Sequence, residues 1–253
     1  MIHKRFIPLL SPLAAWLLCE AFVFNVSFFY ASLSLSSLII IFSVRYIMHE
    51  KNSAWFLFSI SPVLFFLSFA GYAAVTISHF WIQACFLLII WFLFLYFRNL
   101  YYYSNYPEHE EEWSEKLINL MIAGGFLISF SSAALVFVLP AFLGWPLWYM
   151  LPALIIISAL LFFQFRGLHN HKLKPKTSLV LINILILAEF AWIFSLLPLN
   201  FNILALFLAI AYYLGLTIIR LDASSNLNRH AVKIPLLMSL AAIALLLLTS
   251  RWL

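Results

Sequence analysis

Long runs of apolar residues, separated by short polar segments, repeat from one end of the chain to the other. A helix needs about 20 residues to cross the roughly 30 Å hydrocarbon core of a bilayer, and nine runs approach that length. We therefore predict nine membrane-spanning helices, over 7–24, 29–48, 54–76, 80–100, 117–139, 147–165, 177–197, 202–220 and 234–252. The division between the first two depends on Asn25-Val26-Ser27 alone, so counts of eight and ten stay open.

The composition agrees with a membrane environment. Apolar residues make up 66% of the 253 residues, and charged residues only 9%. Soluble domains average roughly 45–50% apolar and about 25% charged residues, because polar side chains must cover their surface. We predict an all-α, polytopic transmembrane helix bundle that forms a single domain over residues 1–253.

Lys and Arg indicate the orientation, since positive residues in short loops stay on the cytoplasmic side of a membrane. With the N-terminus inside, the nine spans place every Lys and Arg except Arg251 on that side. The outer connections, near 25–28, 77–79, 140–146 and 198–201, contain no Lys, Arg, Asp or Glu. We predict an N-terminus inside the cell, a C-terminus outside, and a multi-pass position in the cytoplasmic membrane.

Several kinds of chemistry lack the residues they need. Asp222 is the only aspartate, so the paired-aspartate sites that hold magnesium and a diphosphate cannot be assembled. The seven histidines lie in loops or at span ends, which disfavours haem ligation across the bundle. No glycine-rich loop followed by Lys and Ser or Thr cradles a nucleotide. We expect no catalytic residue, no metal site and no cofactor.

Two carboxyl groups lie well inside the predicted hydrocarbon, Glu20 and Glu189. A charged group at this depth costs about 2.5–3.5 kcal/mol, so each glutamate should be neutral, paired or in contact with water. In the predicted topology both lie at similar depth in the outer half of the membrane. One hypothesis joins them, with Asn25 or Asn200 above, in a protonatable site for a cation or proton. The other gives each carboxyl one interhelical hydrogen bond that fixes packing.

Two cytoplasmic segments carry most of the remaining polar residues. The loop 166–176 is basic and adjoins a span, so anionic lipid headgroups are its expected partner. Its cations are Arg166, Lys172, Lys174 and Lys176. Nucleic acid is not expected, because one short loop offers no platform.

The segment 98–116 combines acidic residues after Pro107, at an expected helix start, with aromatic residues that suit a membrane interface. These aromatic residues are Tyr101, Tyr102, Tyr103, Tyr106 and Trp113.

Other residues predict how the helices pack. Pro62 and Pro152 should each bend a helix, and a neighbouring group should satisfy the carbonyl that the proline leaves free. Gly124 and Gly125 predict a close approach by another helix. Stretches nearly devoid of polar residues, 84–96 and 236–248, should contact lipid or an apolar protein.

The last third of the chain contains three soft motifs, Leu197-Pro-Leu-Asn-Phe-Asn, Tyr212-Tyr-Leu-Gly-Leu216 and Leu248-Thr-Ser-Arg-Trp252. About 55 residues here resemble the C-terminal region of an uncharacterised family of multi-span membrane proteins from candidate-phyla bacteria. The resemblance implies a bacterial cell membrane and a multi-helix bundle. It implies no site residues.

The first function we expect is a non-enzymatic scaffold or accessory subunit of a membrane complex, bound to lipid and to a membrane-protein partner or a second copy. Six glycines and 27 phenylalanines favour a stiff bundle over the broken helices of transporters. The alternative is a small proton- or cation-linked transporter that uses Glu20 and Glu189. A lipid-processing enzyme ranks third.

Overall fold

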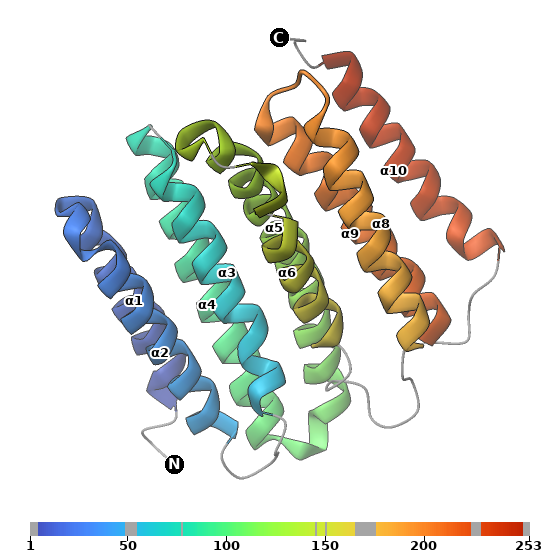
Figure 1. Cartoon of the computed structure of the whole chain (residues 1–253). Coiled ribbons are helices and arrows are strands. Elements are labelled where there is room, and N and C mark those ends of the chain that lie inside the picture. The colour runs from blue at the N-terminus through green and yellow to red at the C-terminus, as the bar shows by residue number, and fades with distance from the viewer. Residues whose placement is uncertain are drawn as a thin grey trace. The chain divides into compact units, whose positions relative to one another are not determined.

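The computed structural model of the chain describes residues 5–48, 55–76, 78–144, 146–149, 151–164, 176–223 and 229–249. Within these ranges the chain is all helical, with nine α-helices and three short 3-10 helices (Figure 1). Eight of the α-helices in the described ranges are long and apolar enough to cross a membrane. The predicted all-α, polytopic bundle is confirmed, and the chain is an integral membrane protein. The orientation of its ends stays a prediction.

The chain divides into two compact units, residues 1–124 and 125–253. The first unit contains α1 (Ile7–Phe24), α2 (Phe29–Met48), α3 (Trp55–Ala74) and α4 (His79–Asn105), with the 3-10 helices η2 (Val26–Phe28) and η3 (Pro107–His109). The helix α5 (Glu110–Leu143) begins in this unit and continues into the second. The second unit also contains η4 (Leu147–Tyr149), α6 (Leu151–Phe163), α8 (Thr177–Ser195), α9 (Phe201–Ala223) and α10 (Arg229–Thr249).

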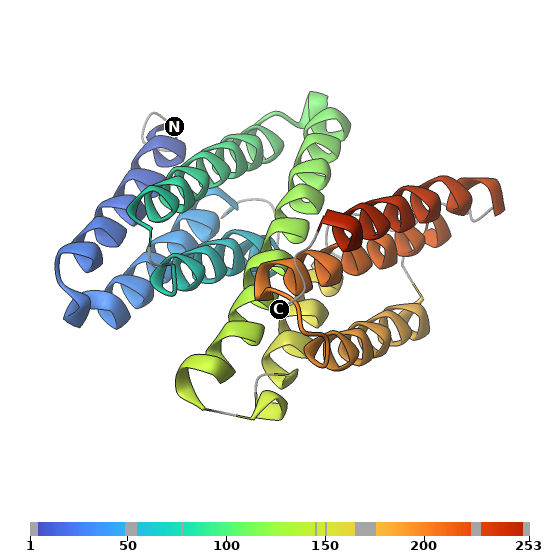
Figure 2. The same cartoon turned by 90° about the horizontal axis from the view of Figure 1, so that it is seen from above.

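The first four helices form a four-helix bundle. In it α1 packs against α2 and α4, and α3 packs against the same two helices (Figure 2). Aromatic rings fill the contact between α3 and α4, where Phe65 stacks on Phe92 with 3.9 Å between ring centroids and Phe69 stacks on Phe65. The stretch 84–96, expected to face lipid or another protein, exposes Leu87 and Trp91 on one side of α4. Its other side contributes to this core, including fully buried Leu93 and Tyr96.

Pro62 lies inside α3 as predicted, and the structure shows what its missing N–H leaves free. In an uninterrupted helix, the N–H of residue 62 would donate to the carbonyl of Phe58. Here the hydroxyl of Tyr96, on α4, donates to that carbonyl at 2.6 Å. The predicted rescue of the freed carbonyl by a neighbouring helix is confirmed.

In the second unit, α8 packs between α6 and α9, and α10 packs on α9. Leu199, Leu204 and Phe207 form a buried cluster that collects side chains from α5, α8 and α10. The outer surface of this unit is strongly apolar. Among the residues of α10 whose side chains are described, only Ser239 is buried. The helix expected to contact lipid or another apolar protein is therefore exposed along most of its length.

The sixth predicted span differs from the structure. Against the expected range of 147–165, α6 has 13 residues and is about 20 Å long, shorter than the hydrocarbon core. Pro152 is the second residue of α6, not an interior residue. A first-turn N–H has no intrahelical partner in any helix, so proline is tolerated there without a bend. The prediction of a bend at Pro152 was wrong because the helix begins later than expected.

The two adjacent glycines of α5 receive aromatic side chains from other helices. A Cβ atom on Gly124 would lie 2.5 Å from the Phe92 ring of α4, and one on Gly125 would lie 2.8 Å from the Tyr212 hydroxyl of α9. Both distances are shorter than van der Waals contact. The predicted close approach at these glycines is confirmed, although the approaching groups are aromatic side chains.

Candidate functional site

Glu20 reaches the neighbouring helix α4. The side-chain amide of Gln83 donates to its carboxylate over 3.5 Å, and the contact is partly buried. Glu20 lies four residues before the end of α1, and Gln83 lies four residues after the start of α4. Antiparallel neighbours place such positions at one depth, so this pair was within reach of sequence reasoning. The apolar pattern around Gln83 gives no sign of this role.

Glu189 has different surroundings. It lies on the exposed side of α8, two residues from the buried Leu187 and therefore about 200° around the helix. Its neighbours one turn away, Leu185 and Ile193, are 60% and 51% exposed. Among the described residues, no hydrogen-bond or ion-pair partner of its carboxyl is found. Glu20 belongs to the first unit and Glu189 to the second, and their predicted pairing stays a prediction.

The two asparagines proposed to complete that pair have local roles. The side-chain carbonyl of Asn25 accepts a hydrogen bond from the backbone N–H of Ser27 at 3.0 Å, at the start of η2. The side-chain carbonyl of Asn200 accepts one from the backbone N–H of Asn202 at 2.9 Å, at the start of α9. Both asparagines are exposed. These turns explain the residue type at both positions, because asparagine commonly bonds the N–H two residues further on.

The predicted contact with anionic lipid is only partly within the described residues. Arg166, Lys172 and Lys174 lie outside them. Lys176, directly before α8, forms an ion pair with Asp222 near the end of α9, with 3.2 Å between Nζ and Oδ1. The lysine side chain is 72% exposed and the aspartate 13%, so the ammonium still faces solvent or headgroups. Asp222, the only aspartate, thus joins the start of α8 to the end of α9.

A hollow of about 410 Å³ lies where α1 begins and α4 ends. It is lined by Arg5, Pro8, Leu9, Phe94, Arg98, Tyr101, Tyr102 and Tyr106. Both arginines are exposed. The pKa of the Arg5 guanidinium is raised, first because the hydroxyl of Tyr101 accepts a hydrogen bond from it and then through the charge interaction with Tyr101 and Tyr106. Of the predicted interface aromatics, Tyr103 is the exception, because it is buried against Phe58.

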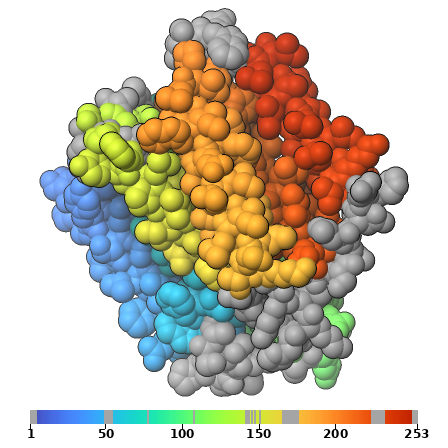
Figure 3. All heavy atoms as spheres, turned by 45° about the vertical axis from the view of Figure 1, so that its right-hand side comes forward, coloured from blue at the N-terminus to red at the C-terminus, as the bar shows by residue number. Residues whose placement is uncertain are grey.

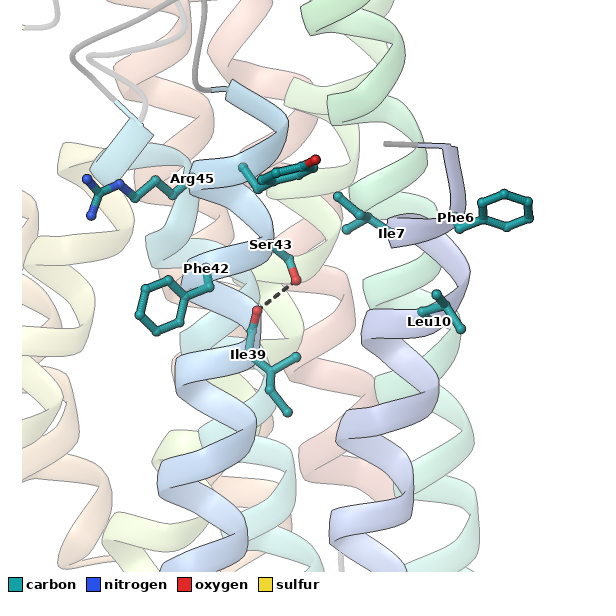
Figure 4. Close-up of a pocket in the computed structure, with 8 residues that line it drawn as sticks. Phe6, Ile7, Leu10, Ile39, Phe42, Ser43 and Arg45 are labelled. Carbon is teal, nitrogen blue, oxygen red and sulfur yellow. Dashed lines mark hydrogen bonds between the residues drawn. The ribbon is translucent and has the colours of Figure 1, made fainter. Parts of the chain in front are cut away.

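A second hollow, of about 780 Å³, lies between α1 and α2. Ile7 and Ile39 point into the space between the two helices, whereas Phe6 and Phe42 point away on opposite sides (Figure 4). The hydroxyl of Ser43 donates to the carbonyl of Ile39 at 2.7 Å and is hydrogen-bonded to Ser11 of α1 at 2.9 Å. The Ser43 hydroxyl is therefore already hydrogen-bonded within the bundle. The walls of this hollow offer a ligand mainly apolar contacts.

Two buried polar side chains in the second unit lack hydrogen bonds to the described residues, Tyr212 and Gln164. The Tyr212 hydroxyl packs against Gly125 and its ring against Phe162. Gln164 follows the last turn of α6 and is fully buried. Sequence reasoning missed both, because a single polar residue in an apolar run does not reveal whether it faces the core.

The described residues bring together no group of three or more His, Cys, Asp or Glu that could hold a metal ion. Cys19 and Cys85 are both free and buried. Comparison with family models, with curated proteins and with solved structures finds no match to the chain. The resemblance of the last third to a bacterial membrane family stays a prediction.

Proposed function

We propose that the protein is a non-enzymatic accessory subunit of a membrane complex, and that its partner docks on the exposed face of α8. The observation that carries the proposal is Glu189, an ionisable side chain among exposed apolar residues. A carboxyl on a lipid-facing surface costs roughly 2.5–3.5 kcal/mol near the centre of a bilayer. A polar group supplied by another helix would remove that cost.

The surroundings of Glu189 suit a helix-to-helix contact. Leu185, Ile186 and Ile193 surround it at helical spacing and are all exposed. Both α8 and α10 reach the surface of the second unit in Figure 3. Apolar side chains provide the packing surface in such contacts, and one polar group fixes the register. A membrane-protein partner or a second copy of the chain would both meet these requirements.

The test is a pull-down of the tagged chain from its native membrane in mild detergent, followed by native mass spectrometry. We expect a second protein, or a second copy, in fixed stoichiometry. Glu189→Leu should lose it, while Glu189→Gln, which keeps a hydrogen-bonding group, should retain it. Glu20→Leu is the matched control, because it removes the other intramembrane carboxyl. A lone chain in every sample would contradict the proposal.

A proton- or cation-linked transporter is the second candidate, supported by the contact between Glu20 and Gln83. The Gln83 amide gives this carboxyl a polar neighbour within the bundle, as a group that carries a proton or a cation through the membrane would need. Purified protein in liposomes with a pH-sensitive dye tests this function. Transport should stop in Glu20→Gln and continue at an altered rate in Gln83→Leu, which removes the amide contact. Absence of flux in the unmodified protein would reject it.

A further inference from the structure

The hollow between the start of α1 and the end of α4 lies at the depth of the lipid headgroups. The 27 residues of α4 give a length of about 40 Å, some 10 Å more than the hydrocarbon core. The first 19 residues of α4 contain no Lys, Arg, Asp or Glu, and Arg98 follows them directly. Arg5 lies two residues before the apolar α1. Both guanidinium groups therefore reach the membrane surface on the same side of the bundle.

The walls of this hollow combine positive charge with hydroxyl groups. Arg5 and Arg98 supply the charge, and none of the described residues that line it is acidic. Tyr101 also lines the hollow, and its phenolic hydroxyl can donate a hydrogen bond to a phosphate oxygen. Arginine presents paired N–H groups that match the oxygens of a phosphate. Two guanidinium groups and a hydroxyl donor make a site for a singly or doubly charged phosphate.

Packing among the aromatic rings holds the wall of the hollow in place. Tyr102 stacks on Trp113 with 4.5 Å between ring centroids, and it also contacts Tyr101 and Tyr106. The ammonium of Lys116 lies 4.1 Å from the Trp113 ring and bonds to Glu112. Trp and Tyr prefer the headgroup region, where one end of the ring is apolar and the other is hydrated. The site is thus preformed at the interface and does not depend on a loop closing over it.

We propose that this hollow binds the phosphate group of an anionic phospholipid, with Arg5, Arg98 and Tyr101 as its contacts. The apolar side chains of Leu9 and Phe94 lie at its membrane side, where they can contact the start of the acyl chains. The proposal does not depend on the function proposed above, because α8 contributes nothing to this site. A bound lipid would join the first and fourth helices of the bundle at their cytoplasmic ends.

The experiment uses the full chain, delipidated in neutral detergent and titrated with phosphatidylglycerol, with phosphatidylcholine or with inorganic phosphate. Native mass spectrometry counts the bound lipids. We expect one phosphatidylglycerol to remain bound where phosphatidylcholine dissociates. Inorganic phosphate in large excess should not displace it, because it lacks acyl chains. Full displacement would assign the hollow to soluble phosphate, and equal retention of the two lipids would also overturn the proposal.

Charge variants separate a built site from general attraction. Arg5→Gln with Arg98→Gln should weaken phosphatidylglycerol binding about tenfold or more, since each cation near a membrane surface strengthens anion binding severalfold. Arg45→Gln with Arg220→Gln is the control, because it makes the same change in net charge at residues that do not line the hollow. Equal loss in both double variants would overturn the proposal.

Arg98→Lys provides an independent test, because it keeps the charge and removes the paired N–H groups. A built site predicts a severalfold loss, and unchanged binding would contradict it.

Discussion

The hydroxyl of Tyr96 on α4 donates to the one carbonyl of α3, that of Phe58, which Pro62 deprives of its helical partner. The donor and acceptor atoms are 2.6 Å apart, and Tyr96 is fully buried. In hydrocarbon no water can take over an unsatisfied backbone group, so the two helices depend on this bond. The bond joins two residues that are 38 positions apart in the sequence.

We predict that Tyr96→Phe lowers the free energy of unfolding by about 1–3 kcal/mol, because it leaves the Phe58 carbonyl unsatisfied in the core. Unfolding in mixed micelles, measured against the fraction of denaturing detergent, gives this value. In the Pro62→Ala background the backbone N–H returns, so the cost of Tyr96→Phe should become much smaller. An equal cost in both backgrounds would show that the tyrosine and the proline act independently.

Tyr212 provides a matched comparison. It is fully buried like Tyr96, but its hydroxyl has no hydrogen-bond partner among the described residues. Removing an unpaired buried hydroxyl relieves a desolvation cost, so Tyr212→Phe should leave stability unchanged or raise it by about 1 kcal/mol. The same unfolding titration measures it beside Tyr96→Phe. A loss as large as that of Tyr96→Phe would mean that the Tyr212 hydroxyl is bonded after all.

Gly124→Ala should destabilise the first unit by about 1–3 kcal/mol, because the new methyl group overlaps the Phe92 ring. The ring cannot move away freely, since it stacks on Phe65. Phe92→Leu removes the overlapping atoms, so the combined variant should lose less than the sum of the two single changes. A strictly additive double-mutant cycle, measured by thermal unfolding, would contradict the contact.

Glu189→Leu should improve the membrane insertion of α8 although it abolishes partner binding. Replacing a carboxyl on an exposed apolar face should favour insertion of α8 by up to about 3 kcal/mol. An insertion assay on the isolated α8 segment measures this directly, with Leu185→Ala as a variant that keeps the carboxyl. Insertion that does not improve would show that Glu189 carries no cost in the membrane and needs no partner.

Hydropathy predicted most helices because each long apolar run corresponds to one helix. Hydropathy predicted the ends of the helices less well. The helix α4 continues to Asn105 and α5 begins at Glu110, because polar residues extend each helix beyond the hydrocarbon. The acidic start of α5 was predicted, with Glu110, Glu111 and Glu112 in its first turn. The short α6 was not predicted, because hydropathy measures the length of an apolar run and not where its helix begins.

For the candidate sites, too, the sequence predicted which residues matter but not what surrounds them. Sequence alone identified Glu20 and Glu189 by the cost of a carboxyl in hydrocarbon, but not the side each one faces. Their surroundings depend on helix rotation, which places Gln83 beside Glu20 and leaves Glu189 exposed on α8. The hollow at Arg5 and Arg98 combines residues from the start of α1 and the end of α4, which lie at the same end of the bundle. No local pattern joins them, and only the antiparallel packing of α1 and α4 does.

The most direct test of the subunit function is photocrosslinking in the native membrane, with a photoreactive residue at Leu185, one turn from Glu189. Leu87 on α4 is the control position, because it is similarly exposed, at 64% against 60%. We predict a protein adduct of defined mass from position 185, none from position 87, and loss of the adduct in the Glu189→Leu background. No adduct at position 185, or equal adducts at both positions, would contradict docking on α8.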